Sequence, residues 1–137
     1  MKKIPIILFL ILITPILSIA KEEKHKIEKE EDICISKCKY NYQIRECVYE
    51  AHLKWEKEIS KYLKLLKNVT TKEKYKLILE SQTDWEKTYK KDKKVVNELI
   101  FNYGGTLYYD IASVEAQQLA KNRAEFLSDL YYTLVEH

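Results

Sequence analysis

The chain has 137 residues, of which 46% are hydrophobic and 33% are charged, and its formal net charge is +3 at pH 7. Without Lys2 and Lys3 of the N-terminal segment, 22 basic residues (24 − 2) stand against 21 acidic ones, so the remaining net charge is about +1. A chain so close to neutral has no general electrostatic reason to bind nucleic acid or an anionic membrane, and both are excluded from the predicted partners.

Residues 1–20, MKKIPIILFLILITPILSIA, have the layout of a secretory signal peptide. Two lysines precede an apolar run over residues 4–17, and Ser18-Ile19-Ala20 forms a small-x-small cleavage site. The alternative is an uncleaved membrane anchor, but the run is shorter than the roughly 20 residues of a spanning helix and contains two prolines. We predict cleavage after Ala20, a periplasmic or secreted protein, and no membrane span in the mature chain.

Export permits disulfides, and the three cysteines are Cys34, Cys38 and Cys47. Their odd number leaves one thiol over, or one bridge to another chain. We expect Cys47 to pair with Cys34, with Cys38 as the alternative partner. A Cys34–Cys38 bridge is least favoured, because one turn of regular helix gives poor disulfide geometry. Zinc binding, with His52 completing the site, is the competing interpretation, and an oxidising compartment argues against it.

The 117 residues after the signal suit one domain. They contain no proline, and Gly104 and Gly105 are the only glycines, which predicts helices rather than strands and turns. Residues 21–32, KEEKHKIEKEED, are predicted to form a solvated, partly frayed arm, and residues 33–137 the helical domain. A short helix is expected at about residues 32–40, and Asn41 is a plausible N-cap for the next one.

The second helix is predicted to end near Asn68. Apolar residues recur along it at steps of three and four, as on one face of a helix. This stripe consists of Ile44, Val48, Ala51, Trp55, Ile59, Tyr62 and Leu66.

The third helix is predicted over about residues 71–103, and the sequence TTKE at 70–73 offers a capping box for its start. Its stripe is mostly apolar but includes an amide and a carboxylate. The members are Tyr75, Ile78, Leu79, Gln82, Trp85, Tyr89, Asp92, Val96, Leu99 and Tyr103.

Gly104 is well placed after the C-cap of this helix, where a left-handed conformation costs glycine little. The connection GGTLYYD leads to Asp110 or Ser113 as the N-cap of a fourth helix. The inner face of that helix is expected to carry Ala116, Leu119, Arg123, Phe126, Leu127, Leu130 and Leu134. The predicted fold is all-α: three long helices in an antiparallel bundle plus a short N-terminal helix.

Asp92 and Arg123 each interrupt an apolar stripe, and they carry opposite charges. Since an isolated buried charge is costly, we predict that the two residues pair, with Gln82 able to satisfy spare donors. The alternative is that each residue lies at the edge of its stripe and reaches water. Both interpretations are architectural, so Gln82, Trp85, Tyr89, Asp92 and Arg123 are predicted to form a structural motif.

Nothing in the chain predicts catalysis. No histidine lies near a candidate nucleophile in a recognisable arrangement, and His52 is expected at a surface or boundary position. The glycine pair lacks the Lys-Ser/Thr continuation of a phosphate-binding loop. We predict no cofactor, no metal and no enzymatic activity.

The segment SQTDWEKTYKKD (residues 81–92), the GGT at 104–106 and Arg123 with Leu127 together resemble the exported LprI-type lysozyme-inhibitor domain. Cys47, followed by Glu56, Ile59, Ser60 and Leu63, is similar to a second, weaker part of that pattern. The resemblance spans about residues 34–134. The chain departs from the family by lacking cysteines at Lys93-Lys94-Val95 and at Ala116-Gln117-Gln118, so the family's second bridge is absent.

The resemblance implies an exported helical protein that binds other macromolecules, with a lysozyme or a cell-envelope protein as the partner. The alternatives are a structural envelope protein without inhibitory activity and, third, a hydrolase or metal-binding protein. The chain's near-neutral charge does not complement a basic lysozyme. The interhelical loop fits a binding role better, because tyrosine is favoured at binding hot spots, although Tyr103 and Tyr108 could instead cap the core. The partner-binding candidates are Tyr103, Gly104, Gly105, Thr106, Tyr108 and Tyr109.

Overall fold

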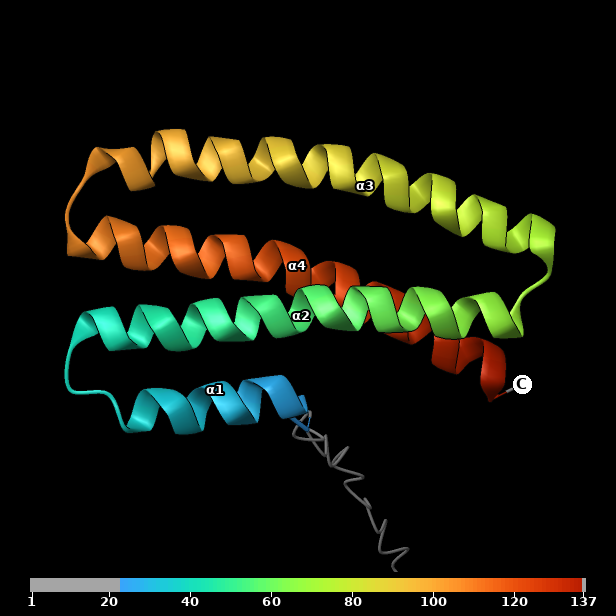
Figure 1. Cartoon of the computed structure of the whole chain (residues 1–137), viewed down its shortest axis with the longest axis horizontal. Coiled ribbons are helices and arrows are strands. Elements are labelled where there is room, and N and C mark those ends of the chain that lie inside the picture. Colours follow the sequence, from blue (N-terminus) through green and yellow to red (C-terminus); the bar gives the residue numbers. More distant parts are fainter. Residues whose placement is uncertain (1–22, 137) are drawn as a thin grey trace, which may run out of the picture.

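The computed structural model describes residues 23–136, so the predicted signal peptide and its cleavage site lie outside the described residues. The described chain forms α1 (Lys26–Ser36), α2 (Asn41–Val69), α3 (Lys72–Leu99), the short 3-10 helix η1 (Phe101–Tyr103) and α4 (Thr106–Val135). The three long helices run antiparallel to their chain neighbours, and α1 lies along the first half of α2 (Figure 1). The predicted all-α architecture is confirmed. No helix within residues 23–136 is long and apolar enough to cross a membrane.

Helix α1 corrects two expectations, a frayed arm over residues 21–32 and a short helix starting near Asp32. It begins at Lys26 because His25 and Glu28 form a capping box. His25 Nδ1 accepts a hydrogen bond from the amide of Ile27 (3.1 Å), and the Glu28 carboxylate accepts one from the amide of His25 (3.0 Å). Ile27 is buried in the core, so this charged stretch contributes an apolar anchor.

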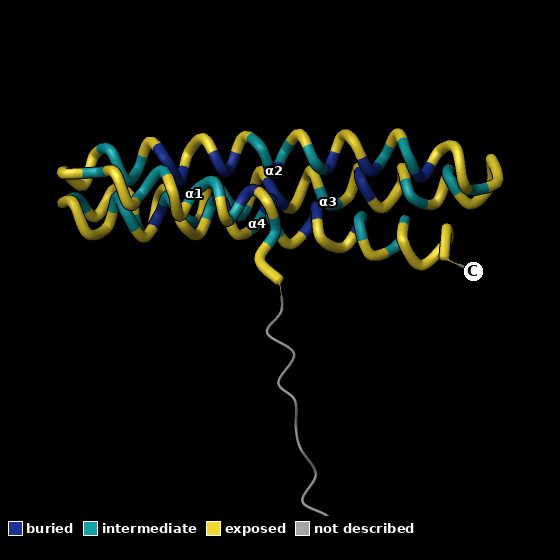
Figure 2. Tube along the Cα trace, turned by 90° about the horizontal axis from the view of Figure 1, so that it is seen from below, coloured by how far each residue is buried: buried dark blue, intermediate teal, exposed yellow. Residues whose placement is uncertain are grey.

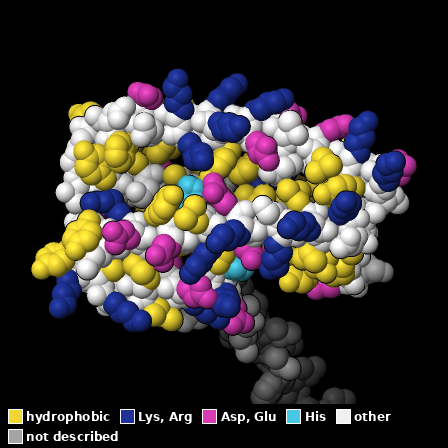
Figure 3. Space-filling view, viewed as in Figure 1, with side chains coloured by type: hydrophobic (Ala, Val, Ile, Leu, Met, Phe, Trp, Pro, Cys, Tyr) yellow, Lys and Arg dark blue, Asp and Glu magenta, His cyan; other side chains and the backbone are white. Residues whose placement is uncertain are grey.

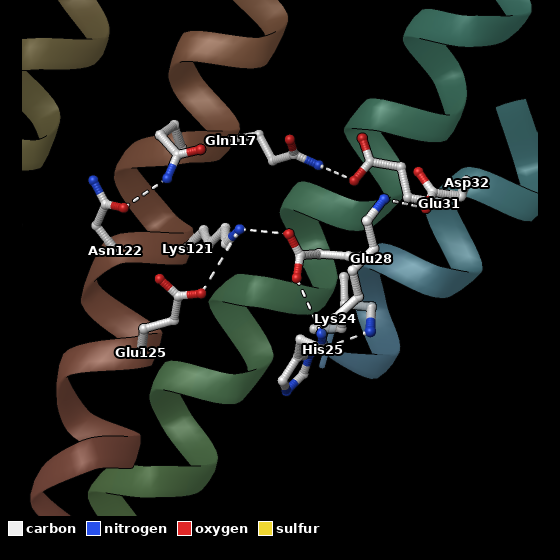
Figure 4. Close-up of polar contacts among 11 residues, drawn as sticks. Lys24, His25, Glu28, Glu31, Asp32, Gln117, Lys121, Asn122 and Glu125 are labelled. Atoms are coloured by element: carbon white, nitrogen blue, oxygen red, sulfur yellow. Dashed lines mark hydrogen bonds and ion pairs between the residues drawn. The ribbon is translucent and has the colours of Figure 1, made fainter. Parts of the chain in front are cut away.

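Charged side chains of α1 also join it to the long helices. Lys121 of α4 donates to Glu28 (2.6 Å), and Gln117 of α4 donates to Glu31 (2.9 Å), as Figure 4 shows. The hydrogen bond from Lys121 holds the pKa of Glu28 below its ordinary value. The stretch is therefore rich in charge because it faces partners on another helix, and not only because it faces water.

A disulfide links α1 to α2. It joins Cys34 and Cys47, whose Cα atoms lie 5.8 Å apart, which confirms the favoured pairing. Cys38 keeps a free thiol. The bridge adds a covalent tie to the side-chain contacts that hold α1 against α2.

Helix α2 carries most of the core. It starts at Asn41 with Tyr40 as its N-cap, one residue before the predicted cap, because the Gln43 side chain accepts hydrogen bonds from the amides of Lys39 (2.8 Å) and Tyr40 (3.2 Å). The predicted stripe is buried from Val48 onward, while Ile44 is half-buried. The buried residues of α2 are Cys47, Val48, Ala51, His52, Trp55, Ile59, Tyr62 and Leu66.

Helices α2 and α4 form the main interface of the bundle. Its α4 side is built largely from small residues, Ala112, Ala120 and Ala124, together with Leu127. Small side chains let two helix backbones approach closely. Figure 2 shows the buried positions gathered on the sides where the helices face one another.

Helix α3 is less buried than its stripe predicted, since only Gln82 and Tyr89 are buried. Leu79, Leu99 and Tyr103 are exposed, and the helix ends at Leu99 rather than near residue 103. The predicted capping box is also wrong: Thr71 is the N-cap and accepts from the amide of Lys74 (3.3 Å).

Helix α4 begins earlier than predicted. It starts at Thr106 with Gly105 as its N-cap, and not at Asp110 or Ser113. Two expected core residues, Phe126 and Leu134, are exposed. The centre of its inner face lies instead on the alanines and Leu127, because that side meets α2.

Candidate protein-binding surface

The α3–α4 connection forms one end of the bundle. Gly104 and Gly105 follow η1 with φ of 84° and 97° and ψ of 153° and 155°. This backbone region is essentially restricted to glycine. A Cβ atom added at either glycine would meet nothing within 4 Å, so the glycines serve the backbone conformation and leave the tip of the loop open. Gly104 has the expected positive φ, but its ψ of 153° is not that of a left-handed helical residue, and it follows η1 instead of the C-cap of α3, which is Ile100.

Aromatic and apolar side chains surround this turn. Tyr103 is 74% exposed and Leu107 65% exposed, and Phe101 and Tyr108 are also exposed. We call these four residues the aromatic end. Hydrophobic side chains gather on this end of the molecule, at the left of Figure 3. Tyr103 and Tyr108 therefore do not cap the core, and it is Tyr109 that is half-buried.

Two ring contacts and one ion pair hold the aromatic end in place. The Tyr103 and Tyr108 ring centroids lie 4.6 Å apart, and those of Phe101 and Tyr109 lie 4.5 Å apart. Below them, Arg45 of α2 pairs with Asp110 of α4 at 2.9 Å. The loop is therefore braced against α2, so its exposed rings lose little freedom on binding.

The polar residues of the predicted structural motif lie in the middle of the bundle. Arg123 is 8% exposed, and its Nε donates to Gln82 Oε1 at 3.0 Å. Its two terminal nitrogens each lie 3.3 Å from the Ser81 hydroxyl and donate to it. The guanidinium carbon lies 5.7 Å from the centre of the Trp85 ring, within cation–π range.

The predicted Asp92–Arg123 pair is wrong. Within the described chain no ion pair joins them, and Asp92 is half-buried on α3. The helix rises about 1.5 Å per residue, so Asp92 lies about 15 Å further along α3 than Gln82. Arg123 can therefore reach only one of them. Gln82 is not a solvent-facing edge residue, and it supplies the acceptor that the guanidinium needs.

A second polar cluster joins α2 to α3. The Tyr89 hydroxyl donates to Glu56 (2.8 Å) and lies 2.6 Å from His52 Nε2. Since the phenolic proton is used on Glu56, His52 Nε2 must donate to the tyrosine oxygen. Burial lowers the pKa of His52, and burial together with the bond to Glu56 raises the pKa of Tyr89. His52 is buried, which corrects the expected boundary position.

A groove of about 330 Å³ opens beside His52 and is lined by residues of α2, α3, η1 and α4, including Phe101 of the aromatic end. Its walls are mostly alanine, valine and aromatic side chains. Ser113 also lines this groove, but its hydroxyl donates to the carbonyl of Tyr109 (2.8 Å). No group of three or more metal-ligating side chains is placed to hold an ion anywhere in residues 23–136.

Sequence reasoning missed the His52–Tyr89–Glu56 cluster and the bracing pair of Arg45 with Asp110. His52 and Glu56 share one face of α2 at a spacing of four, which is the only local signal for the first. No local signal marks the second, because its members lie 65 positions apart.

Fold and surface together define a class of protein: a small helical domain with an internal disulfide, whose buried polar residues hydrogen-bond between helices and whose exposed rings gather at one end. The chain matches the model of the family described as lysozyme inhibitor LprI over residues 34–127, and it belongs to this family. Neither the curated proteins nor the solved structures compared with the chain include a match.

Proposed function

We propose that the protein is an exported, non-catalytic inhibitor that binds a lysozyme through the aromatic end. Membership of a lysozyme-inhibitor family supports a protein partner of this kind. The observation that carries the choice of surface is the exposure of Tyr103, Leu107, Tyr108 and Phe101 around an open glycine turn. Exposed apolar surface of this kind marks interaction sites, and aromatic anchors supply much of the affinity at interfaces.

The mode of inhibition follows from the shape of this end. A turn without side chains on Gly104 and Gly105, flanked by rings, is narrow enough to enter a concave surface such as a polysaccharide-binding cleft. Because the protein is nearly neutral, the rings and backbone groups, rather than net charge, provide the binding energy. We therefore expect the affinity to change little with salt, since screening acts on charge pairs.

The test is the clearing of a bacterial cell-wall suspension by lysozyme in the presence of the purified exported protein. Tyr103→Ala and Leu107→Ala are expected to raise the inhibitor concentration required by about tenfold or more, the effect of losing roughly 1.4 kcal/mol of binding. Leu77→Ala on α3 is the matched control, because Leu77 and Leu107 are both helical leucines with 65% exposure. The control should inhibit like the wild type.

Two outcomes would contradict the proposal. Equal loss of inhibition in the Leu77 and Leu107 variants would move the binding surface away from the aromatic end. A wild-type protein that neither inhibits nor binds lysozyme would favour the alternative, a cell-envelope-associated helical protein with no inhibitory activity. Circular dichroism of all variants separates lost binding from lost folding.

A further inference from the structure

Three sulfur atoms lie together where α1 turns into α2. Cys34 and Cys47 are bridged, and the free Cys38 Sγ lies 3.6 Å from Cys47 Sγ. The Cys38 thiol also donates a hydrogen bond to the Cys34 carbonyl at 3.3 Å, which holds it in this position. The free thiol is thus in van der Waals contact with one particular sulfur of the disulfide.

Access to the three sulfurs differs. Cys34, Cys38 and Cys47 all line a solvent-open hollow of about 450 Å³, but Cys47 is 4% exposed, whereas Cys34 and Cys38 are half-exposed. A thiol from solution meets little of Cys47, whereas the Cys38 Sγ already lies 3.6 Å from the Cys47 sulfur. Among the described residues, Cys38 is therefore the thiol placed to attack Cys47.

Both candidate partners lie beside Cys47. Cys38 follows the end of α1 at Ser36, but its amide still donates to the carbonyl of Ile35 (3.0 Å), so the backbone continues as a tight turn. Cys34 is bonded to Cys47, and the Cys38 Sγ lies 3.6 Å from the Cys47 sulfur. A bridge from Cys47 spans 13 positions to Cys34 and 9 positions to Cys38. The closure entropies of such similar loops shift the equilibrium between the two bridges by a factor of only about two.

We propose that Cys34, Cys38 and Cys47 form a thiol–disulfide exchange site in which the bridge moves between two positions. The Cys38 thiolate attacks Cys47 Sγ, the Cys38–Cys47 bond forms, and the Cys34–Cys47 bond breaks. Cys34 leaves as a thiolate and takes up the proton that Cys38 lost. The number of disulfides and thiols is unchanged, so no oxidant or reductant is needed.

Exchange changes what holds α1. In the observed state the covalent tie lies within the helix, at Cys34. After exchange it lies in the turn, at Cys38, and α1 is held by Ile27 and by its contacts with α4. The thiol presented to the hollow is then that of Cys34, so a partner or a small disulfide would meet a different cysteine in each state.

The experiment starts from one disulfide isomer of the exported protein, isolated in acid, where thiols are protonated and exchange stops. The isomer is shifted to pH 5, 6 or 7, quenched in acid and alkylated with excess N-ethylmaleimide before digestion with trypsin. Cleavage after Lys37 separates the two candidate partners of Cys47. The linked products are residues 30–37 with 46–54 for one isomer and residues 38–39 with 46–54 for the other.

We expect both linked products, with an interconversion rate that rises about tenfold per pH unit, because the thiolate is the nucleophile. The rate should not depend on protein concentration. Cys38→Ser should show only the first product, and Cys34→Ser should form the Cys38–Cys47 bridge with unchanged helicity.

The proposal is overturned if the native protein keeps a single linkage, with only one cysteine alkylated, after prolonged incubation at pH 8. A rate proportional to protein concentration would also overturn it, because it would assign the exchange to collisions between molecules. The proposal is also overturned if a folded Cys34→Ser variant leaves Cys38 and Cys47 unbridged under oxidising conditions.

Discussion

Replacing Gln82 with leucine tests whether the buried guanidinium depends on its amide partner. The change removes the acceptor of the 3.0 Å bond from Arg123 Nε while keeping a side chain of similar bulk. The Ser81 contacts, at 3.3 Å, are longer and shared between two nitrogens, so they cannot replace it. Losing a hydrogen bond to a charged group costs about 1.5–3 kcal/mol, and we expect Gln82→Leu to lower the free energy of unfolding by about 2 kcal/mol.

Urea unfolding with the disulfide intact measures this loss directly. For a domain of this size, about 2 kcal/mol corresponds to a fall in Tm of about 8 °C. Adding Arg123→Met removes the stranded charge, so the double variant should be less destabilised than the sum of the two single variants.

Asp92→Asn is the matched control for the opposing hypothesis. Asp92 has no contact with Arg123, so this change should cost less than about 0.5 kcal/mol, as at ordinary surface sites. If Gln82→Leu costs no more than Asp92→Asn, or if the single-variant losses simply add, the buried guanidinium does not depend on Gln82 and the reasoning is refuted.

Four further predictions concern other parts of the bundle. Because burial lowers the pKa of His52, the unfolded chain takes up a proton that the folded chain does not, and stability should fall as pH drops below about 6.5. Tyr89→Phe removes the hydroxyl that His52 Nε2 and Glu56 share, so it should lower the free energy of unfolding in urea by about 1–2 kcal/mol. An unchanged urea midpoint would contradict the cluster. Gly104→Ala should lower the free energy of unfolding by about 1–2 kcal/mol because of the positive φ at this position, without a steric clash of the added Cβ. A variant as stable as the wild type would show that the turn adopts another conformation. Ile27→Ala should lower the free energy of unfolding, measured by thermal unfolding, by about 2–4 kcal/mol, and Lys26→Ala is the near-neutral control. Equal, small effects of the two changes would mean that α1 does not pack against the core.

Local chemistry accounts for what was predictable. The absence of proline and the single glycine pair predicted long helices, and the stripe on α2 predicted its buried face because one amphipathic face must meet the core. Helix geometry disfavoured a Cys34–Cys38 bridge, which made Cys47 one partner of the disulfide, and the favoured pairing with Cys34 is the one the structure contains. The glycine turn was located from residue type, since few other residues adopt positive φ.

The errors in helix starts come from local caps such as His25 with Glu28, whereas the errors in burial and pairing arise because partners distant in sequence determine them. Residues 26–32 look like a solvated arm until Lys121 and Gln117 of α4 are placed opposite Glu28 and Glu31. Arg123 has two polar candidates on α3, and only the register of the antiparallel helices decides between Gln82 and Asp92.

The sequence by itself determined that the chain is a helical bundle of this family and located its glycine turn, and it favoured the Cys34–Cys47 bridge over the Cys38 alternative. Only the tertiary structure decided that Tyr103 and Tyr108 face outward, that His52 lies inside against Tyr89, and that Cys38 touches Cys47. Periodicity specifies which side of a helix is apolar, whereas the crossing and register of neighbouring helices decide which of those residues are covered.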